Sequence, residues 1–244
     1  MSKDLVNQDS VPSDGDSLFG HGHTQAGICF LVICLLHFVS TLVSIWCVRD
    51  GQLGQFAPGR LLVFVPLNLE LWRLTLFTAV LSNLSLVVLA VLMRELLERR
   101  FRAHMLVALV LVAIGVSNCV SGEMDLMVGF ADSCWGRFAH PGALGDTSVQ
   151  IAWSLFGSAV TRCLLVGNSL YGIAALIMFS CALSSRLFPR GLAMLGTPLV
   201  VLISIMSVLA FFANFHWVLW CLLVTEALFV TWTFAMGFVL LNSK

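Results

Sequence analysis

The stretch 217–241, WVLWCLLVTEALFVTWTFAMGFVLL, is apolar apart from three threonines and a single carboxylate, Glu226. An α-helix needs about 20 apolar residues to cross ~30 Å of hydrocarbon. Similar runs precede this one at about 25–48, 68–93, 103–121, 160–184 and 191–213. The sequence therefore predicts an all-α membrane protein, a bundle of six transmembrane helices whose backbone polar groups are satisfied within each helix.

The composition supports this fold class and excludes some functions. The chain is 59% hydrophobic and 11% charged, with a mean hydropathy of +0.97. Soluble domains carry about 25% charged residues, so a lipid bilayer must cover the apolar surface of this chain. The formal net charge is zero, which argues against nucleic acid as a partner.

The first 24 residues differ from the rest of the chain because they are polar and acidic. They lack the basic start and the small-residue cleavage site of a secretory signal. We therefore expect residues 1–24 to form a disordered cytoplasmic tail and residues 25–244 to form the six-helix transmembrane domain. The expected location is a cell membrane of the bacterial inner-membrane type, which the chain crosses several times.

The orientation follows from the positive-inside rule, which counts only lysine and arginine. The cluster Arg94, Arg99, Arg100 and Arg102 lies between the second and third runs. This loop should be cytoplasmic, so that both termini are cytoplasmic as well. The loops at about 49–67 and 122–150 then face outward, and the glycines and prolines of the first predict irregular structure. The segment 149–160 either lies in the interface or extends the fourth helix.

Charged residues inside a bilayer are costly and are functional candidates by default. Counting ~1.5 Å per residue from the helix ends places one group of polar residues toward the outer leaflet. The group comprises Glu70, Arg73, Arg162, Asn168, His216 and Glu226. A polar cavity that opens outward would explain why these residues gather at one level. Some of them also have a purely structural interpretation. Glu70 and Arg73 can pair at i,i+3, and the long side chain of Arg162 can reach the membrane interface. Glu226 should face the bundle interior, with Arg162 as its first expected partner and Asn168 or His216 next.

No sequence motif predicts a cofactor or a metal site. His37 lies near the middle of the first run without a matching second haem ligand, and His21 and His23 are a short tail fragment. Glu123, Asp125 and His140 do not follow the spacing of a zinc site. Most of the eight cysteines fall in or beside apolar runs, where cysteine behaves as a small hydrophobe. A Cys119–Cys134 disulfide would need an oxidising compartment.

The C-terminal third resembles a family of bacterial six-helix membrane proteins of unknown function. The resemblance rests on Gly167-Asn168 to Gly172, on the turn Ser185-Arg186-Leu187-Phe188-Pro189-Arg190-Gly191-Leu192-Ala193, and on Glu226 to Trp232 with Gly237. It covers about residues 160–241 by motif and implies the six-helix topology but no activity. The longer outer loop and the acidic tail of this chain depart from the family pattern.

Three functions remain open from the sequence. The first is a non-enzymatic role, as an accessory subunit or as a binder or carrier of a small amphiphile or lipid, because no catalytic motif is present. The alternative is an intramembrane enzyme that uses Glu226 with His216 or Arg162. The third is a subunit of a larger complex, in which these residues meet another membrane subunit.

Overall fold

The computed structural model describes residues 16–51, 58–97, 99–139, 142–185, 188–212 and 215–242. Side chains are described within these ranges except at 16–22, 48–51, 58–60, 143–145 and 215–216. All regular structure in this part of the chain is helical, and six of its helical segments are long and apolar enough to cross a membrane. The predicted fold class, an all-α protein with six transmembrane helices, is confirmed.

The described residues form ten α-helices, some of which run directly into one another, and all of them except α2 contribute to the six spans. The helices are α1 (Asp16–Gly51), α2 (Pro58–Leu67), α3 (Leu69–Leu96), α4 (Arg102–Met124), α5 (Ala131–Ala139), α6 (Ala143–Val160), α7 (Asn168–Ser184), α8 (Arg190–Met194), α9 (Gly196–Phe211) and α10 (Phe215–Asn242). A 3₁₀ turn, η2 (Arg99–Phe101), leads into α4. Two π-helical segments, η3 (Asp125–Phe130) and η4 (Thr161–Gly167), join α4 to α5 and α6 to α7. Residues 1–15 of the expected tail lie outside the described part, and α1 begins at Asp16.

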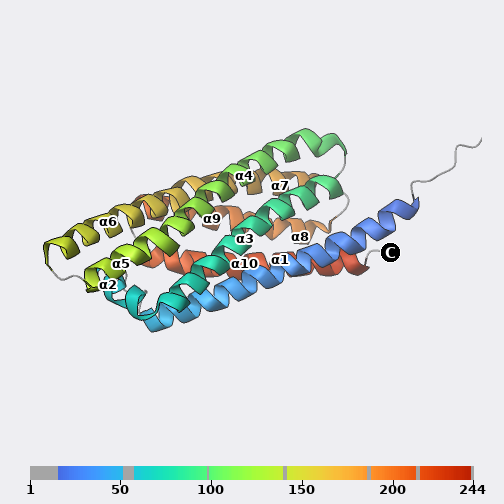
Figure 1. Cartoon of the computed structure of the whole chain (residues 1–244). Coiled ribbons are helices and arrows are strands. Elements are labelled where there is room, and N and C mark those ends of the chain that lie inside the picture. Colours follow the sequence, from blue (N-terminus) through green and yellow to red (C-terminus); the bar gives the residue numbers. More distant parts are fainter. Residues whose placement is uncertain are drawn as a thin grey trace, which may run out of the picture.

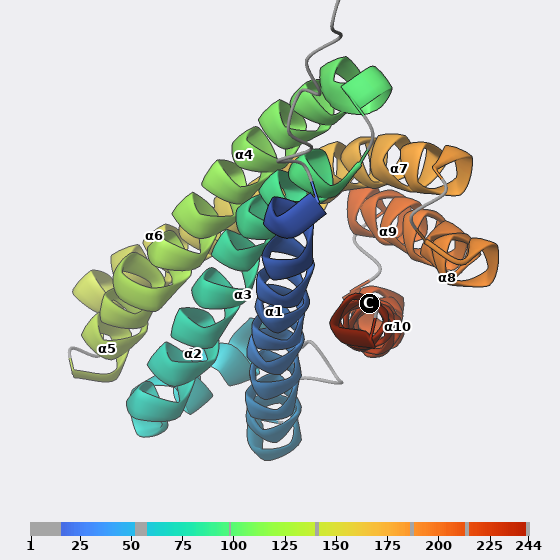
Figure 2. The same ribbon diagram turned by 90° about the vertical axis from the view of Figure 1, so that its right-hand side faces the viewer.

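The spans form a closed ring in chain order. α1 packs on α3, α3 on α4, α4 on α7, α7 on α9, α9 on α10, and α10 returns to α1 (Figures 1 and 2). The closure between α1 and α10 is tight because Gly27 and Gly237 face each other, and a Cβ on Gly237 would lie 3.0 Å from the Gly27 carbonyl oxygen. Small residues at such contacts let membrane helices approach closely.

Two spans are much longer than the bilayer requires. The third runs from Arg99 to Ala139 and the fourth from Asp146 to Ser184, each about 60 Å of helix at 1.5 Å per residue against a hydrocarbon thickness of ~30 Å. Their distal parts, α5 and α6, lie side by side with α2 at the end of the bundle opposite the end of α10 (Figure 1). The segment 149–160 therefore belongs to one continuous helical span.

The expectation of irregular structure at 49–67 is wrong for the part that α2 occupies, and the expected loop at 122–150 is mostly helical. Helix α2 occupies Pro58–Leu67, and α4, η3, α5 and α6 fill most of the second range. A separate apolar cluster stabilises this helical end; its buried members are Cys47, Leu61, Phe64, Val65, Trp72, Leu76, Phe130, Ala131, Cys134 and Ala152. Asp132 on α5 and Asp146 on α6 are exposed, and charged positions on helices with one apolar face make this end too polar to be recognised as part of a span.

Helix α1 starts and α10 finishes at the same end of the bundle (Figure 1). Which side of the membrane this is stays a prediction based on the arginine cluster. Cys134 cannot report it as a natural label, because it is fully buried in the outer cluster.

Two introduced cysteines would test the orientation. In a cysteine-free background, Ala139→Cys, which is exposed at the far end, should react with a membrane-impermeant maleimide added to intact cells. Glu95→Cys, exposed near the arginine cluster, should react only after the membrane is opened. The reverse pattern would place both termini outside.

Candidate functional site

A histidine–carboxylate pair joins the first and last spans in the middle of the bundle. Nδ1 of His37 lies 2.9 Å from Oε2 of Glu226. Because a carboxylate can only accept, Nδ1 carries the hydrogen. His37 is 4% exposed and its ring contacts the Phe229 ring at 4.4 Å between centroids. Glu226 thus faces the bundle interior and has a polar partner, which satisfies a group that would otherwise be costly in a membrane.

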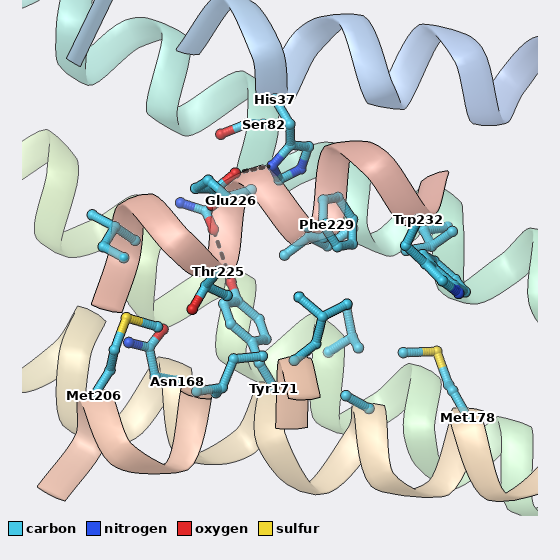
Figure 3. A pocket seen from close by; sticks show the side chains of 18 of the residues that line it. His37, Ser82, Asn168, Tyr171, Met178, Met206, Thr225, Glu226, Phe229 and Trp232 are labelled. Atoms are coloured by element: carbon cyan, nitrogen blue, oxygen red, sulfur yellow. Dashed lines mark hydrogen bonds and ion pairs between the residues drawn. The ribbon is translucent and has the colours of Figure 1, made fainter. Parts of the chain in front are cut away.

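The pair lines a cavity of about 160 Å³ inside the ring of helices. Every span contributes to its wall: His37 from α1, Asn83 from α3, Val112 from α4, Tyr171 from α7, Met206 from α9 and Glu226 from α10 are examples. Figure 3 shows these elements converging on the cavity. Because all six spans line the cavity, a molecule bound in it would contact every span of the bundle.

The polar side chains gather on one side of the cavity, next to Met206, and the opposite side is apolar (Figure 3). Asn168, Tyr171, Thr225 and Glu226 come early in α7 and α10, toward the end that carries α2, α5 and α6. One to two turns later, the same helices supply the apolar wall, formed by Ala175, Met178, Phe179, Phe229 and Trp232. Trp232 is held there by edge-on contacts with Phe30 and Phe179.

Three buried polar atoms on residues of the cavity wall have no hydrogen-bond partner among the described residues. They are Nε2 of His37, Nδ2 of Asn168 and Nε1 of Trp232. Buried polar groups in folded proteins are nearly always paired with protein or water. With Nδ1 bonded to Glu226, neutral His37 presents Nε2 as an acceptor, whereas the other two nitrogens are donors. The wall therefore offers unused hydrogen-bonding capacity of both kinds.

A second polar group adjoins the cavity on the side of α3, α4 and α7. The hydroxyl of Tyr171 donates to Oδ1 of Asn83 at 3.2 Å, and Nδ2 of Asn83 donates to Oε1 of Glu123 at 2.7 Å. Asn83 and Tyr171 line the cavity, whereas Glu123 lies behind them and is 8% exposed. The two π-helical segments lie close to this group in the chain, at Asp125–Phe130 and Thr161–Gly167, and such segments are frequent at functional sites.

The expected pair of Arg162 with Glu226 is wrong. Nη1 of Arg162 donates to Oδ2 of Asp125 at 2.9 Å and to Oγ of Ser121 at 2.7 Å. Arg162 lies in η4 and Asp125 begins η3, so the pair ties the two π-helical segments together. Asp125 belongs to the range 122–150, which was expected to be an outer loop. This range is helical beside Arg162, and Asp125 is therefore the nearer partner.

The remaining predicted site residues fall in different places. Asn168 lines the cavity, whereas Glu70 and Arg73 are exposed on α3 and are not part of its wall. His216 falls in the first turn of α10, and its side chain lies outside the described residues. Of the six sequence candidates, the structure thus brings Asn168 and Glu226 together at one cavity.

The cysteines and acidic residues give no metal centre within the described ranges. No group of three histidine, cysteine or acidic side chains there is arranged to hold a metal ion. Cys119 faces Cys163 rather than Cys134. Each of these two thiols donates to the backbone carbonyl of the other residue, at 3.8 and 3.4 Å.

Comparison with known proteins adds no relative: no family model, no curated protein and no solved structure matches the chain. The functional inference therefore rests on the geometry of the site.

Sequence reasoning missed His37 as the partner of Glu226, and missed Asn83, Glu123 and Tyr171. A signal was present, since His37 and Glu226 lie near the middle of their runs and hence at similar depth. What the sequence lacks is the information that the first and last spans are neighbours. Glu123 was missed for a different reason. It lies in the range 122–150, which was expected to be an outer loop.

Proposed function

We propose that this protein binds a small amphipathic molecule in the central cavity and acts as a binder or carrier for it in the membrane. The observation that carries the proposal is the cavity itself, in which polar and apolar walls are separated along the bundle axis. Ligand pockets are mostly apolar with a few placed polar groups, and sites at mid-depth between helices are typical of membrane carriers.

The size and chemistry of the cavity favour a small ring or short chain that carries a hydroxyl or similar group. A dry cavity of about 150 Å³ is known to hold one benzene molecule, and this one measures about 160 Å³. A hydroxyl could donate to Nε2 of His37 or accept from Nδ2 of Asn168, both of which lack partners among the described residues. The apolar part would then lie against Phe229 and Trp232.

The polar end of the cavity points to the end of the bundle that carries α2, α5 and α6. If the arginine cluster is cytoplasmic, this is the outer leaflet of a membrane of the bacterial inner-membrane type. The ligand would lie with its polar group toward the outer face. Arg162 is already paired with Asp125, so the structure gives no support to an enzyme that combines Arg162 with Glu226.

Para-bromophenol is a suitable probe, because its hydroxyl matches the polar end and its bromine quenches indole fluorescence on contact. Saturable quenching is expected for the full-length protein in lipid nanodiscs, and Trp232→Phe should remove the saturable part. Ala175→Phe, which fills the cavity from α7, should abolish saturable binding.

Leu176→Phe is the matched control, because the adjacent side chain is 56% exposed on the lipid side of the same helix. It should bind the probe as the wild type does. Quenching that rises without saturation and is equal in all four proteins would show only partition into lipid, and would contradict the proposal.

A further inference from the structure

Glu123 differs from the other two carboxylates in the interior of the bundle. Glu226 has His37 as a partner and Asp125 has Arg162, each at 2.9 Å. Glu123 is more buried than either, at 8% exposure, and no basic side chain in the described ranges lies within ion-pair distance of it. Its Oε1 accepts one hydrogen bond from Asn83, and its Oε2 is buried without a partner in this part of the chain.

The helices pack closely next to Glu123 in the sequence. On the preceding position, a Cβ on Gly122 would lie 2.7 Å from the Cys163 sulfur and 3.1 Å from the Ala159 carbonyl oxygen. One turn below, Cys119 and Cys163 exchange hydrogen bonds with each other's backbone. A buried charge without a partner is costly, and binding a proton at the unpartnered Oε2 would remove that charge.

Asn83 connects this carboxyl group to the cavity. Its amide accepts from Tyr171 on one side and donates to Glu123 on the other, and both Asn83 and Tyr171 line the cavity. A hydrogen bond to an ionised acceptor is roughly twice as strong as one between neutral groups, and linked hydrogen bonds polarise one another. A change of charge on Glu123 therefore alters the donor strength of Asn83 and the hydroxyl that Tyr171 presents to the cavity.

We propose that Glu123 is a proton-binding site coupled through Asn83 and Tyr171 to the cavity, so that the ligand binds or moves together with a proton exchange. In this step the carboxylate takes one proton from water at Oε2 and becomes a neutral carboxyl group, and the reverse step returns that proton to water. The coupling rests on the proposed function, whereas the proton site itself does not.

Several other titratable groups surround Glu123. Cys119 lies on its own helix, Cys163 and Arg162 lie on η4, Tyr171 lies on α7, and Asp125 follows in η3. Arg162 and Asp125 neutralise each other. The pair of His37 and Glu226 lines the same cavity, so the proton site must be identified by a signal that belongs to Glu123 alone.

Infrared difference spectroscopy on the full-length protein in nanodiscs supplies that signal, because a protonated carboxyl group has its own C=O band. A band that changes with pH is expected, and Glu123→Gln should remove it while Glu226→Gln leaves it in place. Asn83→Leu should move it to higher wavenumber, because Oε1 loses its hydrogen bond. The absence of any band that depends on Glu123, or a band that is constant over the whole pH range of the folded protein, would overturn the proton site.

Adding para-bromophenol separates the coupling from the site. The Glu123 band should shift or change in intensity in the wild type and stay constant in Ala175→Phe. If the Glu123 band depends on pH but the protein does not bind the probe, the proposed function is contradicted and the proton site is supported. A probe that binds without changing the band would overturn the coupling.

Discussion

His37→Ala should lower the free energy of unfolding by about 3 kcal/mol, because it leaves the Glu226 carboxylate in the bundle without its partner. This value lies at the lower end of the cost of breaking a buried ion pair, because the Glu226 side chain is 27% exposed. The measurement is unfolding in mixed detergent micelles, followed by circular dichroism. His104→Ala, at an exposed position near the start of α4, is the control and should change little.

Two further variants distinguish the pair from a simple packing effect. Glu226→Gln should cost less than Glu226→Ala, because an amide still offers a hydrogen-bond acceptor to Nδ1 of His37. The double variant His37→Ala with Glu226→Ala should be more stable than the two single losses together predict. Strict additivity of the two losses would show that the two side chains do not interact.

Gly167→Ala should destabilise the protein by roughly 2 kcal/mol, although alanine is the better helix former. A Cβ at Gly167 would overlap the sulfur of Cys119 and lie 3.2 Å from the carbonyl oxygen of Arg162. Cys119 lies on α4, so the overlap falls in the contact between α4 and η4, whereas Arg162 belongs to η4 itself.

Gly157→Ala is the matched control for this substitution. It lies on the same span, in α6, and a Cβ there meets nothing within 4 Å. The control should be unchanged or gain up to about 1 kcal/mol from helix propensity. Equal stability of the two variants, measured by the same unfolding experiment, would contradict the close approach of α4 to η4.

The sequence was sufficient for the fold class because hydrophobic length is a direct consequence of bilayer thickness. It could not give the true extent of the third and fourth spans, where α5 and α6 continue beyond the bilayer as helices with one apolar face. The residues between 122 and 150 mix charged and small residues with scattered large apolar ones, and the cluster around Phe130 and Trp72 shows how their apolar side chains are buried.

The candidate site was only partly predictable for a related reason. Glu226 and Asn168 stood out as polar residues within apolar runs, and both line the cavity. Pairing is a property of helix neighbours, and the ring places the first span against the last. Distance along the chain therefore favoured Arg162 as the partner of Glu226, whereas the structure gives that role to His37 and pairs Arg162 with Asp125.

The most direct test of the central cavity is an experimental density map of the natively purified protein in lipid nanodiscs. We expect α1 to adjoin α10 and Nδ1 of His37 to lie within hydrogen-bond distance of the Glu226 carboxylate. We also expect density of a small amphiphile in the space between Asn168 and Trp232. A map in which Glu226 points into lipid, with α1 and α10 apart and no cavity between the six spans, would contradict this expectation.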